Sequence, residues 1–279
     1  MENAYQKTKI LAITSSLSHK RTEDPDFGNR LLYFESKKDL KNPLVIEVKY
    51  LITRNEQLVL ESGSNSNLKD KTGPASLAAY LLPRGLEATD PSIRKIADEI
   101  TQNINDPLQK AQAIYQYVLK HMQYDKSGDG WGRGDALYAC QVGKGNCTDF
   151  HALFISLAKA SGIPARFFMG IPLPKDPAGK PSSGYHCWAE FYIAGRGWIP
   201  VDASEAWKNK SKSEYFFGNL DPDRIMISEG RGIRLSPKQD GPDLNYLSKP
   251  YVEIDGKPFD QYKLERTYKN TNLKSEGKL

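Results

Sequence analysis

The sequence predicts an α+β fold, with a small β-rich region over residues 1–73 and a larger unit over residues 74–279 that combines helices with an antiparallel sheet. Three observations predict this class. Apolar runs with partial two-residue alternation fill the first part of the chain, and apolar residues at helical spacing follow them. Runs rich in aromatic and β-branched residues come last, and no internal repeat is found.

The N-terminal region is predicted to contain short strands. Residues 30–35 and 44–52 are short apolar runs with partial alternation, and residues 7–13 are strand-like. Residues 61–74 (ESGSNSNLKDKTGP) are rich in Ser, Asn, Gly and Lys, which predicts a linker or long loop after the strands. The region could be part of a larger β-sandwich.

Two helices are predicted next. Asp90 is available as an N-cap and Pro91 fits the first helical position of a helix that starts there. A second helix is predicted over residues 107–122, with its apolar residues on one face. Residues 124–135 (YDKSGDGWGRGD) contain four glycines and are predicted to form a loop.

A third helix is predicted to begin at Cys147, directly after the Gly-rich segment GKGN at residues 143–146. Residues 148–160 are apolar almost all round, which is typical of a buried helix. The sequence SGIP at residues 161–164 ends it.

Strands are predicted after this helix. Residues 165–170, 185–194 and 197–203 are the main ones, and the last two are joined by a tight hairpin at Gly195-Arg196-Gly197. Shorter strands are expected around residues 225–227 and 251–254.

Composition excludes several classes of function. The net charge of +5 is spread along the chain without the dense basic stripe that nucleic-acid binding requires. No segment approaches the roughly 20 apolar residues of a membrane span. The chain has three cysteines, an odd number that argues against a disulfide framework and leaves at least one thiol free. No Asp-x-Asp-x-Asp-Gly calcium loop is present, and no cofactor is indicated.

Cys147 is the strongest candidate for a reactive residue. A helix N-terminus offers unpaired N–H groups and a positive dipole end, which favour the thiolate, the nucleophilic form of cysteine. The same N–H groups could bind an oxyanion. The alternative is that Cys147 is a small buried residue, as many free cysteines are.

His186 and Asp202 are candidates for its partners. A thiol nucleophile needs a base, and the base needs an orienting group. His186 lies on a predicted strand, and Asp202 is expected on the next strand across the hairpin, near the same end of the sheet. The alternative for His186 is a structural role in the sheet.

A zinc site is a weaker alternative. Cys147 and His151 are one helical turn apart, and His186 is followed by Cys187. Adjacent strand residues point to opposite faces, however, so His186 and Cys187 are not expected to share one ion. His151 is expected on the inner face of its helix, and Cys140 and Cys187 are expected to be structural.

Four segments together resemble the bacterial transglutaminase-like superfamily, and the resemblance covers residues 74–202. They are GNCTDF at residues 145–150, SGIPAR at 161–166, YHCWAE at 185–190 and GWIPVD at 197–202. Residues 224–228 and 251–257 resemble the family's closing strands. The resemblance implies a papain-like core in which Cys147 is the nucleophile, His186 the general base and acid, and Asp202 the residue that orients it.

The resemblance also implies that a residue upstream of the cysteine assists the oxyanion hole. Trp131, Tyr124 and Gln141 are the candidates, in that order, and the alternative for each is packing within its loop. The sequence does not decide among them.

The predicted reaction is thiol-dependent acyl transfer on amide bonds of a protein or peptide substrate, through a thioester that is resolved by an amine or by water. The alternative is a non-catalytic binding or scaffold module, against which the intact triad argues. The oligomeric state is left open. As the sequence stands it reads as cytoplasmic, and it would be exported if a signal segment lies upstream, as in many bacterial relatives.

Overall fold

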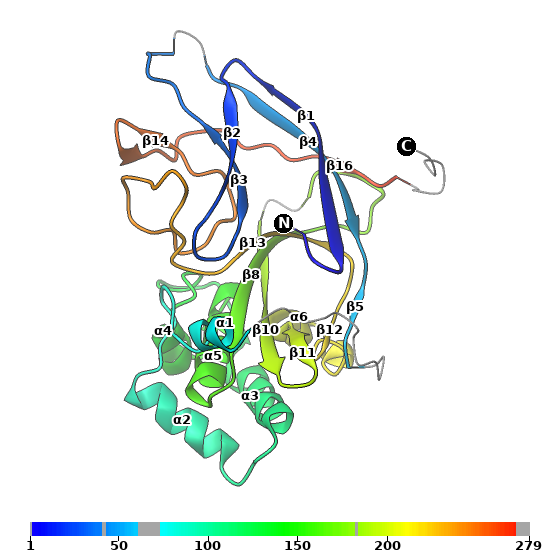
Figure 1. Ribbon diagram of the computed structural model, residues 1–279. Coiled ribbons are helices and arrows are strands. Elements are labelled where there is room, and N and C mark those ends of the chain that lie inside the picture. The colour runs from blue at the N-terminus through cyan, green and yellow to red at the C-terminus, as the bar shows by residue number, and fades with distance from the viewer. Residues whose placement is uncertain (1, 41–42, 61–72, 182–183, 272–279) are drawn as a thin grey trace.

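The computed structural model describes residues 2–40, 43–60, 73–181 and 184–271 (Figure 1). Helices pack against an antiparallel sheet, and hairpins from the N-terminal part of the chain lie beside this core, so the predicted α+β class is confirmed. Of the predicted linker at residues 61–74, residues 61–72 lie outside the described residues.

The central sheet holds four strands in the order β11-β10-β8-β13, and each neighbouring pair is antiparallel. The strands are β8 (Ala165–Pro172), β10 (His186–Ile193), β11 (Gly197–Val201) and β13 (Arg224–Glu229). Ile193 pairs with Gly197, which confirms the predicted tight hairpin between β10 and β11.

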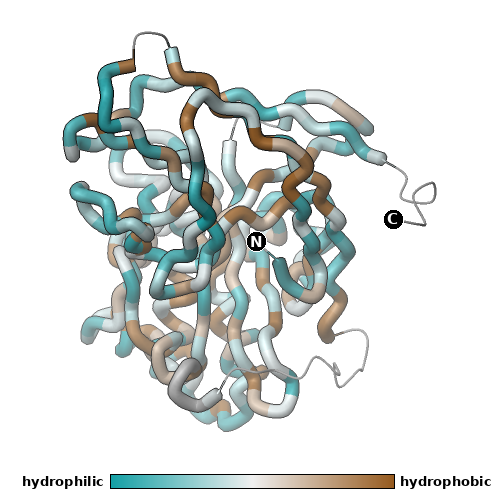
Figure 2. Tube along the Cα trace, turned by 45° about the horizontal axis from the view of Figure 1, so that its top comes forward, coloured by the Kyte–Doolittle hydropathy of each residue, from teal (hydrophilic) through white to brown (hydrophobic). Residues whose placement is uncertain are grey.

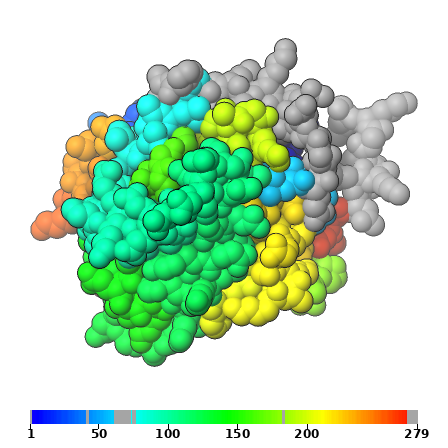
Figure 3. Space-filling view, turned by 90° about the horizontal axis from the view of Figure 1, so that it is seen from below, coloured from blue at the N-terminus to red at the C-terminus, as the bar shows by residue number. Residues whose placement is uncertain are grey.

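Four helices form the layer that covers one face of this sheet. They are α2 (Pro91–Thr101), α3 (Pro107–His121), α4 (Ala136–Val142) and α5 (Cys147–Ala160). The side chain of Asp90 caps α2 as predicted, by accepting hydrogen bonds from the amides of Ser92 and Ile93. Figure 3 shows the helical layer from below, where it forms a continuous green face next to the yellow segment that contains α6.

Helix α4 was not predicted from the Gly-rich sequence around it. It is short, with Asp135 as its cap, and it ends at Gly143 in the left-handed conformation with φ 66°. Such a short helix shows little periodicity, and packing against α5 adds to the stability that its caps provide.

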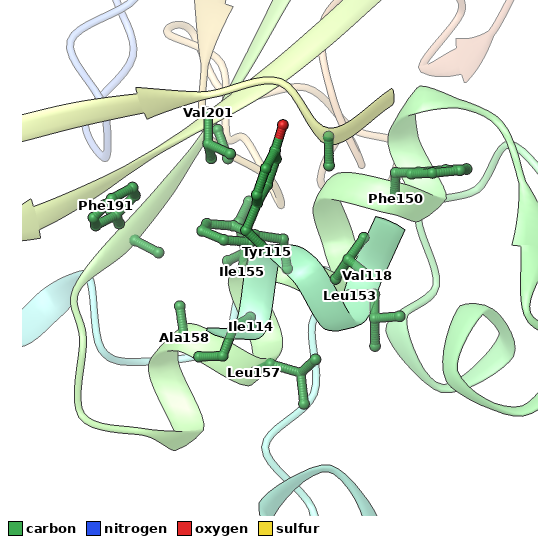
Figure 4. Packing of buried hydrophobic residues seen from close by; sticks show 14 of the residues in the cluster. Ile114, Tyr115, Val118, Phe150, Leu153, Ile155, Leu157, Ala158, Phe191 and Val201 are labelled. Carbon is green, nitrogen blue, oxygen red and sulfur yellow. The ribbon is translucent and has the colours of Figure 1, made fainter. Parts of the chain in front are cut away.

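The core lies between α3, α5 and the sheet. Nearly all of α5 is buried, as its apolar circumference predicts. Figure 4 shows Tyr115 from α3 and Ile155 from α5 near Phe191 and Val201 of the sheet. Because α5 is packed on all sides, its first residue is held in a fixed position relative to β10.

A further helix, α6 (Ala203–Lys208), follows β11 directly. The expectation that Asp202 belongs to a strand is therefore wrong: β11 ends at Val201, and Asp202 is the N-cap of α6. A side-chain oxygen of Asp202 accepts the amide of Glu205, which is why the chain turns into a helix at this residue. The short α1 (Pro74–Ala79) and the 3₁₀ turn η1 (Lys210–Lys212) complete the helical elements of the described residues.

The N-terminal part of the chain forms two antiparallel pairs. β1 (Gln6–Ser15) pairs with β4 (Ile46–Arg54), and β2 (His19–Glu23) pairs with β3 (Arg30–Phe34). The predictions at residues 7–13, 30–35 and 44–52 are confirmed as β1, β3 and β4, whereas β2 was not predicted. Figure 2 shows that hydrophobic residues occur in these outer strands as well as in the core.

Several contacts join these hairpins to the core. The Gln6 side chain bonds both backbone groups of Met226, and Asn29 does the same with Glu229. The small pair of β5 (Gln57–Leu58) with β12 (Asn219–Leu220) adds to this. The other small strand pairs of the described residues are β6 (Gln123–Tyr124) with β7 (Lys144–Gly145), β14 (Glu253–Ile254) with β15 (Lys257–Pro258), and β9 (Ala178–Gly179) with β16 (Tyr268–Lys269). The division of the chain at residues 73 and 74 stays a prediction.

Candidate active site

Cys147 is the first residue of α5, as predicted. Asn146 is the N-cap, and its side chain accepts the amide of Thr148 at 2.9 Å. The carboxylate of Asp149 reaches back to the amide of Asn146, also at 2.9 Å, so the two side chains form a capping box around the cysteine. The helix start is therefore fixed by local hydrogen bonds.

Gly145 makes this arrangement possible. Its φ is 155°, and a Cβ at this position would collide with the carboxylate of Asp149. The missing side chain lets Asp149 fold back over the turn that presents Cys147.

His186 and Asp202 are in direct contact although 16 residues separate them. His186 Nε2 lies 2.6 Å from Asp202 Oδ2, and both side chains are buried. The other oxygen, Oδ1, accepts Ser204 Oγ and the Glu205 amide, each at 3.0 Å. The carboxylate therefore caps α6 with one oxygen and orients the imidazole with the other.

The side chains of His186 and Cys147 interact, and each shifts the pKa of the other. Because Nε2 of His186 contacts Asp202, Nδ1 is the ring nitrogen available to Cys147. Burial disfavours the imidazolium, but the adjacent Asp202 carboxylate and the bond to Cys147 outweigh it and raise the pKa of His186 to about 9. The pKa of Asp202 is held well below its usual range: burial opposes the charge, and His186 and Arg224 more than compensate.

Cys187 affects the pKa of Cys147, which the sequence did not predict. Hydrogen bonding by its thiol is the largest cause that holds the pKa of Cys147 well below its usual range. Burial opposes the shift, and His186 reinforces it. Cys187 Sγ also lies 3.5 Å from His151 Nδ1. Burial raises the pKa of Cys187 well above its usual value, so Cys187 stays a thiol and can donate. Cys187 was expected to be structural, and its effect on the pKa of Cys147 is an additional role.

His151 lies on the inner face of α5, as expected, and is fully buried. Its Nε2 accepts the amide of Ala203 at 3.1 Å, so Nδ1 carries the proton and donates to the carbonyl of Cys147 at 2.7 Å. Burial lowers the pKa of His151, which keeps the ring neutral. Within the described residues, no cluster of three or more His, Cys, Asp or Glu side chains is placed to hold a metal ion.

Trp131 lies in a loop that is tied to the start of α5. The next residue, Gly132, donates its amide to Asp149 Oδ2 at 2.6 Å, and Gly134 donates to Oδ1 at 2.9 Å. On the other side of the loop, Arg231 bonds the carbonyls of Arg133 and Gly134. The loop that carries Trp131 is thus held by side chains from two distant segments.

The other two oxyanion candidates, Tyr124 and Gln141, differ in their position relative to Cys147. Tyr124 is close to the cysteine, since it pairs with Gly145 between β6 and β7. Burial raises the pKa of Tyr124, and the charge of Cys147 adds to the shift. Gln141 lies exposed on α4.

Sequence reasoning missed Asp149, Arg224 and Arg231 as parts of the site. The spacing of Asn146 and Asp149 is a capping-box pattern and could have revealed Asp149. Arg224 bonds Asp202 from a strand 22 residues away, and no local pattern indicates such a contact.

Comparisons with known proteins agree with this architecture. A sequence profile described as the Transglutaminase-like superfamily matches residues 94–203. The chain is 30% identical over 281 residues to an uncharacterized protein of Haemophilus influenzae, and the match covers 86% of this chain and 74% of that relative. It is 24% identical over 134 residues to the uncharacterized protein YebA of Bacillus subtilis, which covers 43% of this chain and 18% of YebA.

Among solved structures, one from Cytophaga hutchinsonii that bears the name "Putative Cysteine Protease" matches with a TM-score of 0.57 and 20% identity. The match covers 82% of this chain and 73% of that one, and at this identity it concerns the fold alone. No helix within the described residues combines the length and apolar character needed to cross a membrane.

Proposed function

The chain belongs to the transglutaminase-like superfamily, and we propose that it catalyses thiol-dependent acyl transfer on amide bonds of protein or peptide substrates. In this proposal Cys147 is the nucleophile, His186 the general base and acid, and Asp202 the residue that orients His186. The supporting observation is the buried line of contacts from Cys147 through His186 to Asp202. An oriented base within hydrogen-bond reach is what a thiol nucleophile requires.

The first step uses the charged pair of Cys147 and His186. The Cys147 thiolate attacks the carbonyl carbon of the amide, and a C–S bond forms. The C–N bond then breaks as the proton on Nδ1 of His186 passes to the leaving nitrogen, which departs as an amine. A thioester and a neutral imidazole remain.

The second step regenerates the site. Neutral His186 takes a proton from water or from an amine as that molecule attacks the thioester. The C–S bond breaks, and the thiolate of Cys147 is released beside the imidazolium. Water gives cleavage of a peptide bond or deamidation of a glutamine side chain, and an amine gives a new amide, so the amide that is attacked and the acceptor together decide the product.

The oxyanion of each step needs hydrogen-bond donors at the carbonyl oxygen. The first amide of a helix has no acceptor within the helix, so the N–H of Cys147 is one proposed donor. Trp131 is the proposed second donor, because the hydrogen bonds of Gly132 and Gly134 to Asp149 hold its loop against the start of α5. Tyr124 and Gln141 are the other candidates.

The experiment is a mass-spectrometric assay with a peptide that contains glutamine and a cleavable backbone, in the presence of a primary amine. Parent protein is compared with Cys147→Ala and with Cys140→Ala, a matched control on α4 away from the site. We expect the parent and the control to give one product class among cross-linked, deamidated and cleaved peptide, and Cys147→Ala to give none. Activity that survives Cys147→Ala would overturn the proposal.

A second measurement separates the enzyme from a binding module. Iodoacetamide labelling near neutral pH should be much faster at Cys147 than at Cys140 or Cys187, because Cys147 alone has a lowered thiol pKa. Equal labelling rates at the three cysteines, with no product from the peptide, would favour the non-catalytic scaffold.

A further inference from the structure

We propose that Arg224 is a positioning residue of this active site, which fixes the Asp202 carboxylate in the orientation that aims His186 at Cys147. The inference rests on the proposed function of the Cys147 site and extends it by one residue. Arg224 is the first residue of β13, and it contacts Asp202 beside His186.

The contact is made to the catalytically relevant oxygen. Arg224 Nη1 lies 2.6 Å from Asp202 Oδ2, the same oxygen that His186 Nε2 approaches to 2.6 Å. A carboxylate offers about four lone-pair sites. Two on Oδ1 serve the cap of α6, and two on Oδ2 serve the imidazole and the guanidinium. Rotation of the Asp202 side chain would break several of these bonds at once.

The guanidinium is itself held rigidly. Asp221 accepts from Nη2 at 2.8 Å and from Nε at 3.3 Å. The Arg224 guanidinium carbon lies 5.4 Å from the centre of the buried Trp188 ring, and the side chain is 3% exposed. A planar guanidinium can bond two carboxylates in fixed directions. An exposed ion pair, in contrast, does little to hold its side chains in one orientation.

Arg224 also acts on the proton affinity of His186. Its positive charge opposes the imidazolium, while the charge of Asp202 favours it. The cation therefore limits how tightly His186 holds the proton that the leaving amine must receive. Charged and titratable groups that face the two side chains come from α5, α6, β4, β10 and the turn before β13: Cys147, His151, Cys187, Asp202, Glu205, Asp221 and Arg54.

The test measures two pH midpoints in the full chain. Iodoacetamide labelling of Cys147 against pH gives the midpoint of thiolate formation, and NMR of ¹⁵N-labelled histidine gives that of His186. In Arg224→Gln we expect both midpoints to move to higher pH, by about 1 unit for loss of one adjacent charge. Turnover should fall about tenfold or more, because small displacements of catalytic groups have large effects on rate.

Arg166→Gln is the matched control. Arg166 is also an arginine of this sheet and is half-buried, but it bonds Glu190 at 2.6 Å, and its guanidinium carbon lies 4.0 Å from the centre of the Trp198 ring. Its loss should lower stability and leave both midpoints in place. Arg224→Lys keeps the charge, so its midpoints should return toward the parent values while turnover stays reduced, since an ammonium cannot span both carboxylates.

Asp221→Asn covers the case in which Arg224→Gln does not fold. Removal of this carboxylate leaves the guanidinium charge less compensated, so the midpoint of His186 should move to lower pH. Midpoints that stay at the parent values in folded Arg224→Gln, or in folded Asp221→Asn if the first variant is unfolded, would overturn the role of Arg224. Slow labelling of Cys147 in the parent itself would instead count against the proposed function.

Discussion

Asp149 Oδ2 accepts the backbone amide of Gly132 at 2.6 Å, which ties the loop before α4 to the first turn of α5. The same buried carboxylate accepts the amides of Gly134 and Asn146. Asp149 is thus the common anchor of the helix that starts at Cys147 and of the loop that carries Trp131. Burial raises the pKa of Asp149, and the three amides work against that shift.

The variant Asp149→Ala should be strongly destabilised. It leaves three donors without a partner, and each buried unsatisfied group costs about 1–3 kcal/mol, so we expect a loss of about 3 kcal/mol or more in the free energy of unfolding. Urea denaturation followed by circular dichroism measures it. Asp106→Ala, which removes the exposed cap of α3, is the control and should cost about 1 kcal/mol. Equal losses in the two variants would contradict the anchoring role.

Trp131→Phe tests the oxyanion donor. It keeps an aromatic ring but removes the indole N–H, so we expect kcat to fall about 10²-fold, the usual effect of losing one oxyanion donor. Steady-state kinetics with the peptide substrate measures the change. Tyr124→Phe and Gln141→Ala should keep a kcat close to that of the parent protein, and a larger loss in either one would assign the donor role to that residue.

Peptide turnover and iodoacetamide labelling of Cys147 should depend differently on pH. The pKa of His186 is raised to about 9, so the imidazolium that the proposed mechanism uses to protonate the leaving amine persists through neutral pH and is lost above about pH 9. Peptide turnover should decline there, whereas iodoacetamide labelling of Cys147, which needs only the thiolate, should continue. In Asp202→Asn the alkaline limb should move to lower pH, because the carboxylate that stabilises the imidazolium is gone. Parallel loss of turnover and labelling above pH 9 would contradict the assignment.

Cys187→Ala should make Cys147 less acidic. Hydrogen bonding by the Cys187 thiol is the largest cause of the lowered pKa of Cys147, and a hydrogen bond to a charged group contributes about 1.5–3 kcal/mol. Labelling of Cys147 near pH 6 should therefore slow by about tenfold or more. Cys187→Ser, which keeps a donor, should restore much of the rate, and Cys140→Ala should have no effect. An unchanged rate in Cys187→Ala would show that the bond has no influence on the thiolate.

The sequence by itself determined those helices and turns that are specified by residues close together in the chain. The cap at Asp90, the helix that begins at Cys147 and the hairpin at Gly195–Gly197 were predicted because caps, glycine turns and hydrophobic periodicity act over a few residues. The family pattern extended this to the order of Cys147, His186 and Asp202. Helix α4 was missed because its seven residues show too little periodicity.

Only the tertiary structure decided what surrounds the three candidate residues. Asp202 lies one residue beyond its strand and caps α6, so one carboxylate serves a helix and an imidazole. Arg224 reaches Asp202 across 22 residues, and Arg231 reaches the carbonyl of Gly134 across 97. Such contacts depend on how sheet and helices pack in space, and a one-dimensional pattern contains no record of that packing.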